Sequence, residues 1–182
     1  MTAELQERAS RIRILLMDVD GVLTDGKLYY LPAAAGGIVE FKGFNAQDGI
    51  ALQWLTWHGI QTGVISGRQS PATEERARQV GMTYVYQGHI EKIPFFEEIV
   101  KKSGFSASEI AYAGDDLTDA PLMRRAGLAF APANARDEVK LCAHYVTQAR
   151  GGDGAIRECA EILLRARGAW DDVLRKYEVA AQ

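Results

Sequence analysis

Short apolar runs recur along the chain and alternate with segments whose apolar positions follow a helical period. The first run, residues 12–17 (IRILLM), ends at Asp18 and has the length of a buried strand. Four other runs have the same character: 61–66 (QTGVIS), 83–86 (TYVY), 109–114 (EIAYAG) and 127–131 (GLAFA). We therefore predict five interior strands.

Helical patterns fill the intervals between these runs. Residues 48–58 place Leu52 and Leu55 on one side, and residues 91–102 gather their apolar side chains on one face. Residues 70–80 predict another helix, and a further one follows Gly151–Gly154 as far as about Arg167. Short strands that alternate with helices predict an α/β fold, with a parallel sheet covered by helices on both faces.

Two segments depart from this alternation. Residues 27–42 contain two short apolar stretches around a turn of small residues (AAAGG), which predicts a protruding β-hairpin. A tail, residues 168–182, follows the last helix. We find no repeat and no linker, and 182 residues suit one compact domain. We therefore expect a single domain over residues 1–182, with its core at 12–164.

The composition argues against a disordered or membrane protein, whereas the net charge excludes little. Hydrophobic residues make up 47% and charged residues 25%, as in an ordinary globular protein, and the net charge is -3. These totals give no indication of a nucleic-acid or membrane partner. The cysteines, Cys142 and Cys159, have neither zinc-site spacing nor the density of a disulfide framework. With no apolar run of signal-peptide length at the N-terminus, we expect a cytoplasmic protein.

Polar residues follow the ends of the predicted strands. Asp18 and Asp20 follow the first strand, Ser66 ends the second, Lys92 begins the helix after the third, and Asp115 follows the fourth. In an open parallel sheet, ligands bind beyond the carboxyl ends of the strands. We therefore expect these five residues to converge on one edge of the sheet.

Asp18 and Asp20 suit a phosphoryl-transfer reaction. On extended backbone, residues two apart share a face, and Gly21 lets the chain turn sharply after them. Asp18 would attack phosphorus as the nucleophile, and Asp20 would protonate the leaving oxygen and later activate water. Taken alone, the pair also fits two turn-forming aspartates at a strand end.

The acidic residues predict a magnesium site. Several carboxylates at neighbouring strand ends repel one another unless a hard cation lies among them, and Mg²⁺ prefers oxygen ligands. We assign Asp18 and Asp115 as carboxylate ligands and Asp20 as a ligand through its backbone carbonyl, with Asp116 and Asp119 in supporting positions. Asp115 and Asp116 also fit the first turn of a predicted helix.

A second group of residues suits binding of the phosphate. Lys92 would offset its negative charge, and the Ser66 hydroxyl and the amides near Gly67 would hold its oxygens. Arg68 and Arg76 could pair with a substrate carboxylate. Each also has a plain structural reading: a helix-cap serine, a solvated lysine or a surface arginine.

Longer motifs resemble a known family. DVDGVLTDG, SGR, the lysine of QGHIEK and GDDLTD stand in the order of the four motifs of the haloacid dehalogenase superfamily. FNAQDG, GVISGRQSPATEERARQVGM, VYQG, APANA, HYVTQ and GGDGAIRE resemble the 3-deoxy-D-manno-octulosonate 8-phosphate phosphatase family. The resemblance covers about residues 12–164. It implies a Rossmann-like phosphatase that acts on a small anionic sugar phosphate with Mg²⁺ and serves lipopolysaccharide sugar synthesis.

The resemblance also implies a site without a cap domain, in a homotetramer whose neighbouring hairpin covers it. Only 45 residues separate Asp20 from Ser66 and 25 separate Ser66 from Lys92, so neither interval holds an inserted domain. The substrate contacts that the resemblance implies are Asp20, Asn45, Gln47, Asp48, Gly49, Ser66, Gly67, Arg68, Arg76 and Lys92.

Three positions depart from the family pattern. Gln47 stands where members often have arginine, Gln53 where a basic residue can occur, and Asp153 where arginine or asparagine is more usual. Each change removes a possible anion contact. A nine-carbon relative, 2-keto-3-deoxynononate 9-phosphate, is therefore an alternative substrate. A receiver-like phospho-acceptor domain is the alternative without turnover.

Overall fold

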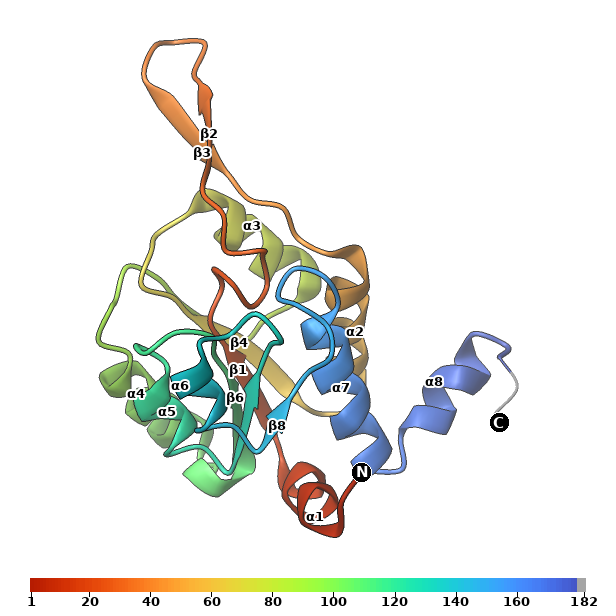
Figure 1. Cartoon of the computed structure of the whole chain (residues 1–182). Helices are drawn as coiled ribbons and strands as arrows, with labels where there is room; N and C mark the ends of the chain where they lie inside the picture. The colour runs from red at the N-terminus through yellow and green to blue at the C-terminus, as the bar shows by residue number, and fades with distance from the viewer. Residues whose placement is uncertain (180–182) are drawn as a thin grey trace.

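The computed structural model describes residues 1–179 (Figure 1). Among them, six parallel strands form the central sheet, in the order β5-β4-β1-β6-β7-β8. The strands are β1 (Ile14–Met17), β4 (Gln61–Ile65), β5 (Tyr84–Tyr86), β6 (Ile110–Ala113), β7 (Leu128–Ala131) and β8 (Tyr145–Val146). The predicted α/β fold with a parallel sheet is confirmed.

The central strand β1 divides its side chains between two cores. Leu15 and Met17 belong to one hydrophobic cluster, and Ile14 and Leu16 belong to the other, as the two-residue period of a strand requires. All four side chains are fully buried. Burial of each one stabilises the folded state by about 1.5–3 kcal/mol. This explains why residues 14–17 are apolar throughout.

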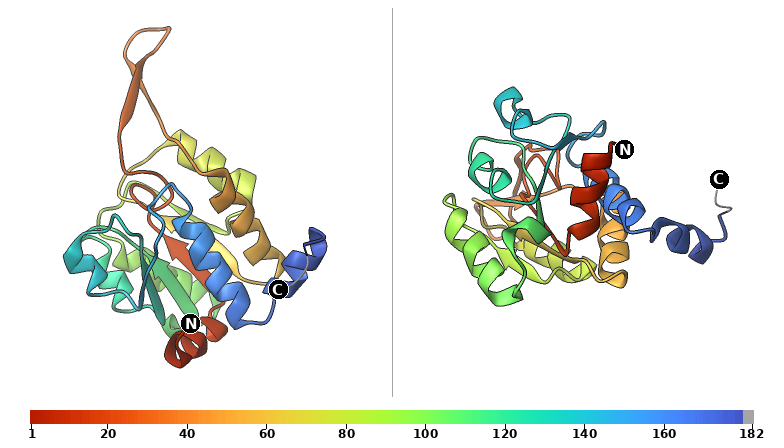
Figure 2. Two further views of the ribbon diagram at one scale, coloured as in Figure 1. Left: turned by 45° about the vertical axis from the view of Figure 1, so that its right-hand side comes forward. Right: turned by 90° about the horizontal axis from the view of Figure 1, so that it is seen from below.

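Helices cover both faces of the sheet (Figure 2). On the face of Leu15 lie α1 (Ala3–Arg11), α2 (Ala46–Trp57), α3 (Pro71–Val80) and α7 (Ala155–Ala166). On the face of Ile14 lie α4 (Ile93–Ser103), α5 (Ala120–Met123) and α6 (Asp137–Lys140). A single 3-10 turn, Ala107–Glu109, precedes β6.

A β-hairpin projects from the edge of the sheet where β1 ends (Figure 1). Its strands, β2 (Tyr29–Pro32) and β3 (Ile38–Phe41), pair antiparallel and form a sheet of their own. Tyr29 stacks on Phe41 with ring centroids 5.0 Å apart. Most apolar side chains of the hairpin are exposed to solvent, and Ile38 has an exposed fraction of 72%. The predicted hairpin at 27–42 is confirmed.

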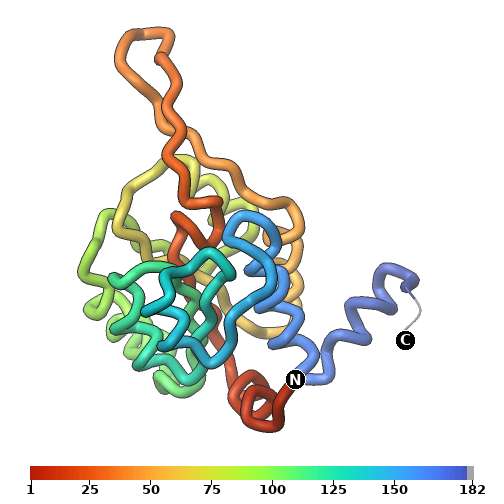
Figure 3. The backbone as a smooth tube through the Cα atoms, in the orientation of Figure 1, coloured from red at the N-terminus to blue at the C-terminus, as the bar shows by residue number. Residues whose placement is uncertain are grey.

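The tail forms a helix away from the hairpin (Figure 3). Trp170 of helix α8 (Trp170–Lys176) and Tyr177, which follows the helix, pack against Trp54 of α2, and Trp54 Nε1 donates a hydrogen bond to Tyr177 Oη at 3.1 Å. Residues 168–179 therefore do not cover the ends of β1, β4 and β6 in their own chain. Residues 180–182 of the predicted tail lie outside the described residues.

Some elements differ from the prediction. Helices α1, α5, α6 and α8 and the short strand β8 were not predicted, because each is short or lacks a clear apolar period. No helix begins at Asp115 or Asp116. The Asp119 carboxylate accepts hydrogen bonds from both of their amides, which holds them in a turn, and α5 starts only at Ala120.

Within residues 1–179, none of the helices combines the length and the hydropathy needed to cross a bilayer.

Candidate active site

Three adjacent strands end at one cavity of about 350 Å³. Asp18 follows β1, Ser66 follows β4 and Asp115 follows β6, and the register of β1 with both neighbours brings these ends level. The cavity is lined by Asp18, Asp20, Gly26, Ser66, Gly67, Arg68, Ile90, Lys92, Asp115, Asp116 and Thr118. The structure thus brings together eight of the residues that the sequence singled out.

The loop after β1 lies directly against Asp115. The Asp18 amide donates to the Ala113 carbonyl at 3.0 Å, which continues the pairing of β1 with β6. Gly21 then has φ 89°, and a Cβ atom there would lie 2.0 Å from Asp115 Oδ2. Only glycine lets the loop turn here and approach the carboxylate so closely.

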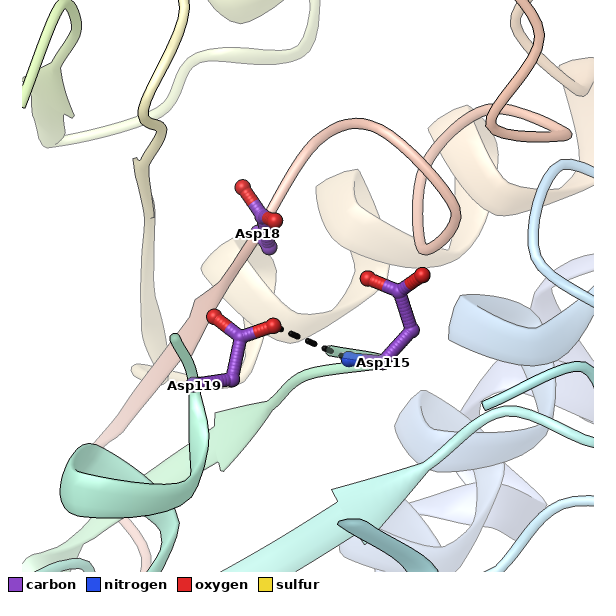
Figure 4. Close-up of side chains that lie close together, drawn as sticks. All are labelled: Asp18, Asp115 and Asp119. Carbon is purple, nitrogen blue, oxygen red and sulfur yellow. Dashed lines mark hydrogen bonds between the residues drawn. The ribbon is translucent and has the colours of Figure 1, made fainter. Parts of the chain in front are cut away.

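Asp18, Asp115 and Asp119 form an acidic cluster (Figure 4). One carboxylate oxygen from each lies within 4.8 Å of the others. Burial, and then the charge of Asp119, raise the pKa of Asp18 to about 6 against the opposing charge of Lys92. Burial and the charges of Asp119 and Asp18 raise the pKa of Asp115 to about 8. Burial and mutual repulsion therefore disfavour ionisation of both carboxyl groups unless a cation binds beside them.

Asp119 has both carboxylate oxygens occupied. Oδ1 accepts hydrogen bonds from Lys92 Nζ at 2.7 Å and from Tyr112 Oη at 2.8 Å. Oδ2 accepts from the amides of Asp115 at 3.0 Å and Asp116 at 3.2 Å. Asp119 is fully buried and is arranged to orient Lys92 and Asp115.

Lys92 brings a positive charge into the acidic cluster. It stands at the N-cap of α4, its side chain is 1% exposed, and Nζ lies 3.0 Å from Asp18 Oδ1. Burial alone would lower the pKa of Lys92, but the charges of Asp18 and Asp119 outweigh it and raise the pKa. The Lys92 ammonium is therefore charged beside the proposed nucleophile.

Tyr112 was missed by the sequence analysis. It lies in β6, fully buried, and its hydroxyl contacts Asp119 and lies 3.4 Å from Lys92 Nζ. Burial and the nearby carboxylates raise its pKa well above the ordinary value, so the hydroxyl remains a donor. The available signal was a polar-tipped residue in an otherwise apolar strand, three positions before Asp115.

A network of charged residues joins the base of the hairpin to the loop after β1. Lys42 Nζ contacts Asp20 Oδ1 and lies 3.4 Å from Glu40 Oε1. Arg68 pairs with Glu40, and its Nε lies 3.6 Å from Asp20 Oδ2. The sequence analysis identified Asp20 and Arg68 but missed Glu40 and Lys42, because nothing local shows that β3 returns to the sheet edge.

Ser66 and Gly67 form the wall of the cavity opposite Asp115. The Ser66 amide continues the β4–β5 pairing by donating to the Tyr86 carbonyl at 2.9 Å. Ser66 Oγ accepts from the Arg68 amide at 3.3 Å. The hydroxyl is thereby held at the cavity, where it can donate to an anionic oxygen.

Five predicted substrate contacts do not line the cavity in this chain: Asn45, Gln47, Asp48, Gly49 and Arg76. Asn45 caps α2, and its side chain accepts from the Gln47 amide at 2.7 Å. Arg76 donates to the Asn45 carbonyl at 3.0 Å, and Gly49 leaves the space that the Arg76 guanidinium fills.

Asp48 connects α2 to the start of α7 through a hydrogen bond. It is 1% exposed, and its Oδ1 accepts from the Arg157 amide in the first turn of α7 at 2.7 Å. Burial raises the pKa of Asp48 to about 6, although the amides at the start of α7 lower it. The N-cap of α2 is Asn45, three positions before Asp48.

The donor set at the cavity suits a hard divalent cation. Asp115 Oδ1 is buried and accepts no hydrogen bond from any residue of the described chain. Asp18 and Asp115 would hold the ion through carboxylate oxygens, and Asp20 through its backbone carbonyl. All of these are oxygen ligands, which Mg²⁺ prefers, and a divalent charge would relieve the repulsion in the cluster.

The chain is similar to known proteins over most of its length. Residues 78–158 match the model of a family described as haloacid dehalogenase-like hydrolase. The 3-deoxy-D-manno-octulosonate 8-phosphate phosphatase of Escherichia coli K12 is 37% identical over 172 residues, which is 94% of this chain and 89% of the relative.

Solved structures share both the sequence and the fold. A probable YrbI family phosphatase from Pseudomonas syringae is 37% identical with a TM-score of 0.92, over 99% of this chain and 100% of that one. The 3-deoxy-D-manno-octulosonate 8-phosphate phosphatase of Moraxella catarrhalis, in complex with magnesium, phosphate and KDO, is 34% identical with a TM-score of 0.91, over 97% and 99%. This chain therefore belongs to the 3-deoxy-D-manno-octulosonate 8-phosphate phosphatase family of haloacid dehalogenase-like hydrolases.

Proposed function

We propose that this protein is a magnesium-dependent phosphatase that hydrolyses 3-deoxy-D-manno-octulosonate 8-phosphate to the free sugar acid and inorganic phosphate. One observation carries the proposal: the Asp18 carboxylate meets Lys92 and Asp115 at the ends of adjacent strands, beside Asp20. A nucleophile, a cation, a metal-binding carboxylate and an acid/base group thus line one cavity.

In the first step an oxygen of Asp18 bonds to phosphorus while the bond from phosphorus to the sugar oxygen breaks. Asp20 gives its proton to that oxygen, so the sugar leaves as an alcohol and Asp18 carries the phosphoryl group. In the second step Asp20 takes a proton from water, whose oxygen bonds to phosphorus as the bond to Asp18 breaks. Inorganic phosphate leaves, and both aspartates return to their starting states.

The first step needs positive charge. A carboxylate about 5 Å from a dianionic phosphate is repelled by roughly 7 kcal/mol at an effective dielectric constant of about 20. Lys92 faces Asp18 and can offset part of this repulsion. A Mg²⁺ ion held by Asp18, Asp115 and the Asp20 carbonyl would supply further charge stabilisation. Ser66 and the nearby amides can hold a second phosphoryl oxygen.

The sugar carboxylate needs a cation at the mouth of the cavity. Arg68 lines the cavity and is partly exposed, so its guanidinium can reach a substrate there. Gln47, Gln53 and Asp153 supply no positive charge at positions where family members often have a basic residue. For this reason the nine-carbon sugar phosphate remains the alternative substrate, to be compared with the eight-carbon one.

We further propose a homotetramer in which the hairpin of a neighbouring subunit covers the cavity. The hairpin presents exposed apolar side chains, and Ile90 (70% exposed) and the exposed Leu117 lie at or near the cavity rim. An apolar arm and an apolar rim on one chain are complementary surfaces for two copies. Gln47 at the start of α2 and Arg76 of α3 would also contribute to the covered site.

The proposed setting is lipopolysaccharide sugar synthesis in the cytoplasm. Cys142 and Cys159 are free thiols in the structure, which fits a reducing compartment.

The proposed reaction is tested by phosphate release from a panel of 2-keto-3-deoxy sugar phosphates. We expect many turnovers per chain with the eight-carbon substrate and Mg²⁺, loss of activity with a chelator, and recovery when Mg²⁺ is restored. A higher kcat/KM for the nine-carbon substrate would contradict the substrate assignment. Release of a single phosphate per chain would contradict turnover and favour a receiver-like acceptor.

A further inference from the structure

Lys42 is a buried lysine that no part of the proposed reaction has used. Its side chain is 2% exposed, and its ammonium contacts Asp20 and lies 3.4 Å from Glu40. Burying an ammonium group is costly unless it is paired and hydrogen-bonded. The two carboxylates provide that pairing, so the position of Lys42 is specified by the structure around it.

Lys42 connects two parts of the chain that are separate in the sequence. It follows the last residue of β3, and Glu40 lies two positions before it, on the same side of extended backbone. Asp20 lies in the loop after β1. The base of the hairpin therefore holds the loop that carries the proposed acid/base group.

The two carboxylate oxygens of Asp20 have different surroundings. Oδ1 accepts a hydrogen bond from Lys42 Nζ. Oδ2 is buried and accepts no hydrogen bond from the described residues, and Arg68 Nε lies 3.6 Å from it. One oxygen is thus fixed, and the other is left available beside the cavity.

We propose that Lys42 is a positioning residue for Asp20. By holding Oδ1 it fixes the rotation of the carboxyl group and leaves Oδ2 as the oxygen that gives its proton to the departing sugar oxygen and later takes a proton from water. This inference rests on the proposed acid/base function of Asp20. It adds a second role to the hairpin, which acts on its own active site through Lys42.

A direct contact between Lys42 and the substrate does not fit the geometry. Lys42 is not among the residues that line the cavity, and its ammonium is already occupied by Asp20 and Glu40. A substrate contact would have to break both pairs.

The test compares Lys42→Met with Lys42→Arg and with Lys27→Met as the control. Lys27 lies at the other foot of the hairpin, and its side chain is largely exposed. Two substrates distinguish protonation of the leaving group from formation of the phosphoenzyme. A sugar phosphate has a poor leaving group and needs the acid, whereas p-nitrophenyl phosphate has a good one and forms the phosphoenzyme without it.

For Lys42→Met we expect the kcat for the sugar phosphate to fall about 100-fold with KM within about threefold, because a misplaced acid/base group affects the chemical step. The rate of the p-nitrophenol burst should stay within about threefold of the wild-type rate, and only later turnovers should slow. Lys42→Arg should recover most of the lost rate, and Lys27→Met should match the wild type.

Two results would overturn the proposal. One is a raised KM with unchanged kcat, which would make Lys42 a substrate contact. The other is an equal fall in the sugar-phosphate rate and the burst rate, which would mean a general structural role. If Lys42→Met does not fold or assemble as the wild type does, Lys42→Gln is measured in the same way and judged by the same two results. Wild-type turnover of the sugar phosphate tests the proposed function separately.

Discussion

The Lys92 ammonium lies 3.0 Å from the Asp18 carboxylate, at the point where the N-terminus of α4 meets the end of β1. The same ammonium donates to Asp119 at 2.7 Å. One buried cation therefore joins the proposed nucleophile to the residue that orients Asp115. Its loss should affect both the reaction and the stability of the fold.

We expect Lys92→Met to lower kcat by about 10²–10³-fold, as loss of a group that stabilises transition-state charge does. It should also lower the free energy of unfolding by about 3–5 kcal/mol, because two buried carboxylates lose their partner. Steady-state kinetics and urea denaturation measure the two effects. Lys101→Met, on the exposed side of α4, is the control. Turnover within about threefold of the wild type would show that Lys92 has no catalytic role.

Tyr112→Phe removes the hydroxyl that donates to Asp119. We expect the free energy of unfolding to fall by about 2 kcal/mol, because the lost hydrogen bond is buried and has a charged acceptor. Tyr84→Phe removes a hydroxyl that donates to neutral Gln61 in a partly exposed place, and it should cost about 1 kcal/mol or less. An equal fall in the free energy of unfolding in the two variants would show that the hydrogen bond to Asp119 stabilises the fold no more than the hydrogen bond to Gln61 does.

Asp48 should make stability depend on pH. Its pKa is about 6 in the folded protein, above its ordinary value of 3.8, so between these values the native state keeps a proton that the unfolded state loses. Stability from this group is therefore present below about pH 4 and is lost as pH rises to about 6. Since one pKa unit corresponds to about 1.4 kcal/mol, the loss amounts to about 2–3 kcal/mol.

Asp48→Asn should remove that dependence, because the amide keeps an oxygen for the Arg157 amide but does not titrate. Denaturation of the wild type and Asp48→Asn from pH 4 to pH 8, at one protein concentration, measures the difference. Parallel curves for the two proteins would contradict the raised pKa.

Gly151 packs against the loop that carries Asp20. A Cβ atom at this position would lie 1.8 Å from the Gly21 carbonyl oxygen, and Asn134 bridges the Gly21 carbonyl and the Gly151 amide. We expect Gly151→Ala to destabilise the protein by about 1–3 kcal/mol and to lower kcat by displacing the loop.

Gly43→Ala is the matched control, because a Cβ atom there meets nothing within 4 Å. Thermal unfolding and kinetics compare the two. A Gly151→Ala variant as stable and active as Gly43→Ala would show that the loop position does not depend on this contact.

The sequence predicted most of what lies at the ends of the strands. Apolar runs locate strands well because buried strands must be apolar, and a parallel sheet gathers the residues that follow them at one edge. Asp18, Ser66, Lys92 and Asp115 converge on the cavity for this reason. Their roles stay predictions.

What the sequence did not reveal depends on contacts between distant segments. Lys42 reaches Asp20 only because β3 returns to the sheet edge, and Asp48 contacts Arg157 only because α2 packs along α7. Tyr112 contributes through a single hydroxyl in an apolar strand. No local pattern encodes these contacts, so three-dimensional packing had to supply them.

Identification of the residue that bears the phosphoryl group tests the central claim most directly. Enzyme quenched in acid during turnover of the sugar phosphate is digested, and the peptides are analysed by mass spectrometry, with Asp18→Asn treated in the same way. We expect a phosphoryl group on Asp18 in the wild type and none in the variant. A phosphoryl group on another residue, or near-normal turnover by Asp18→Asn, would contradict the account.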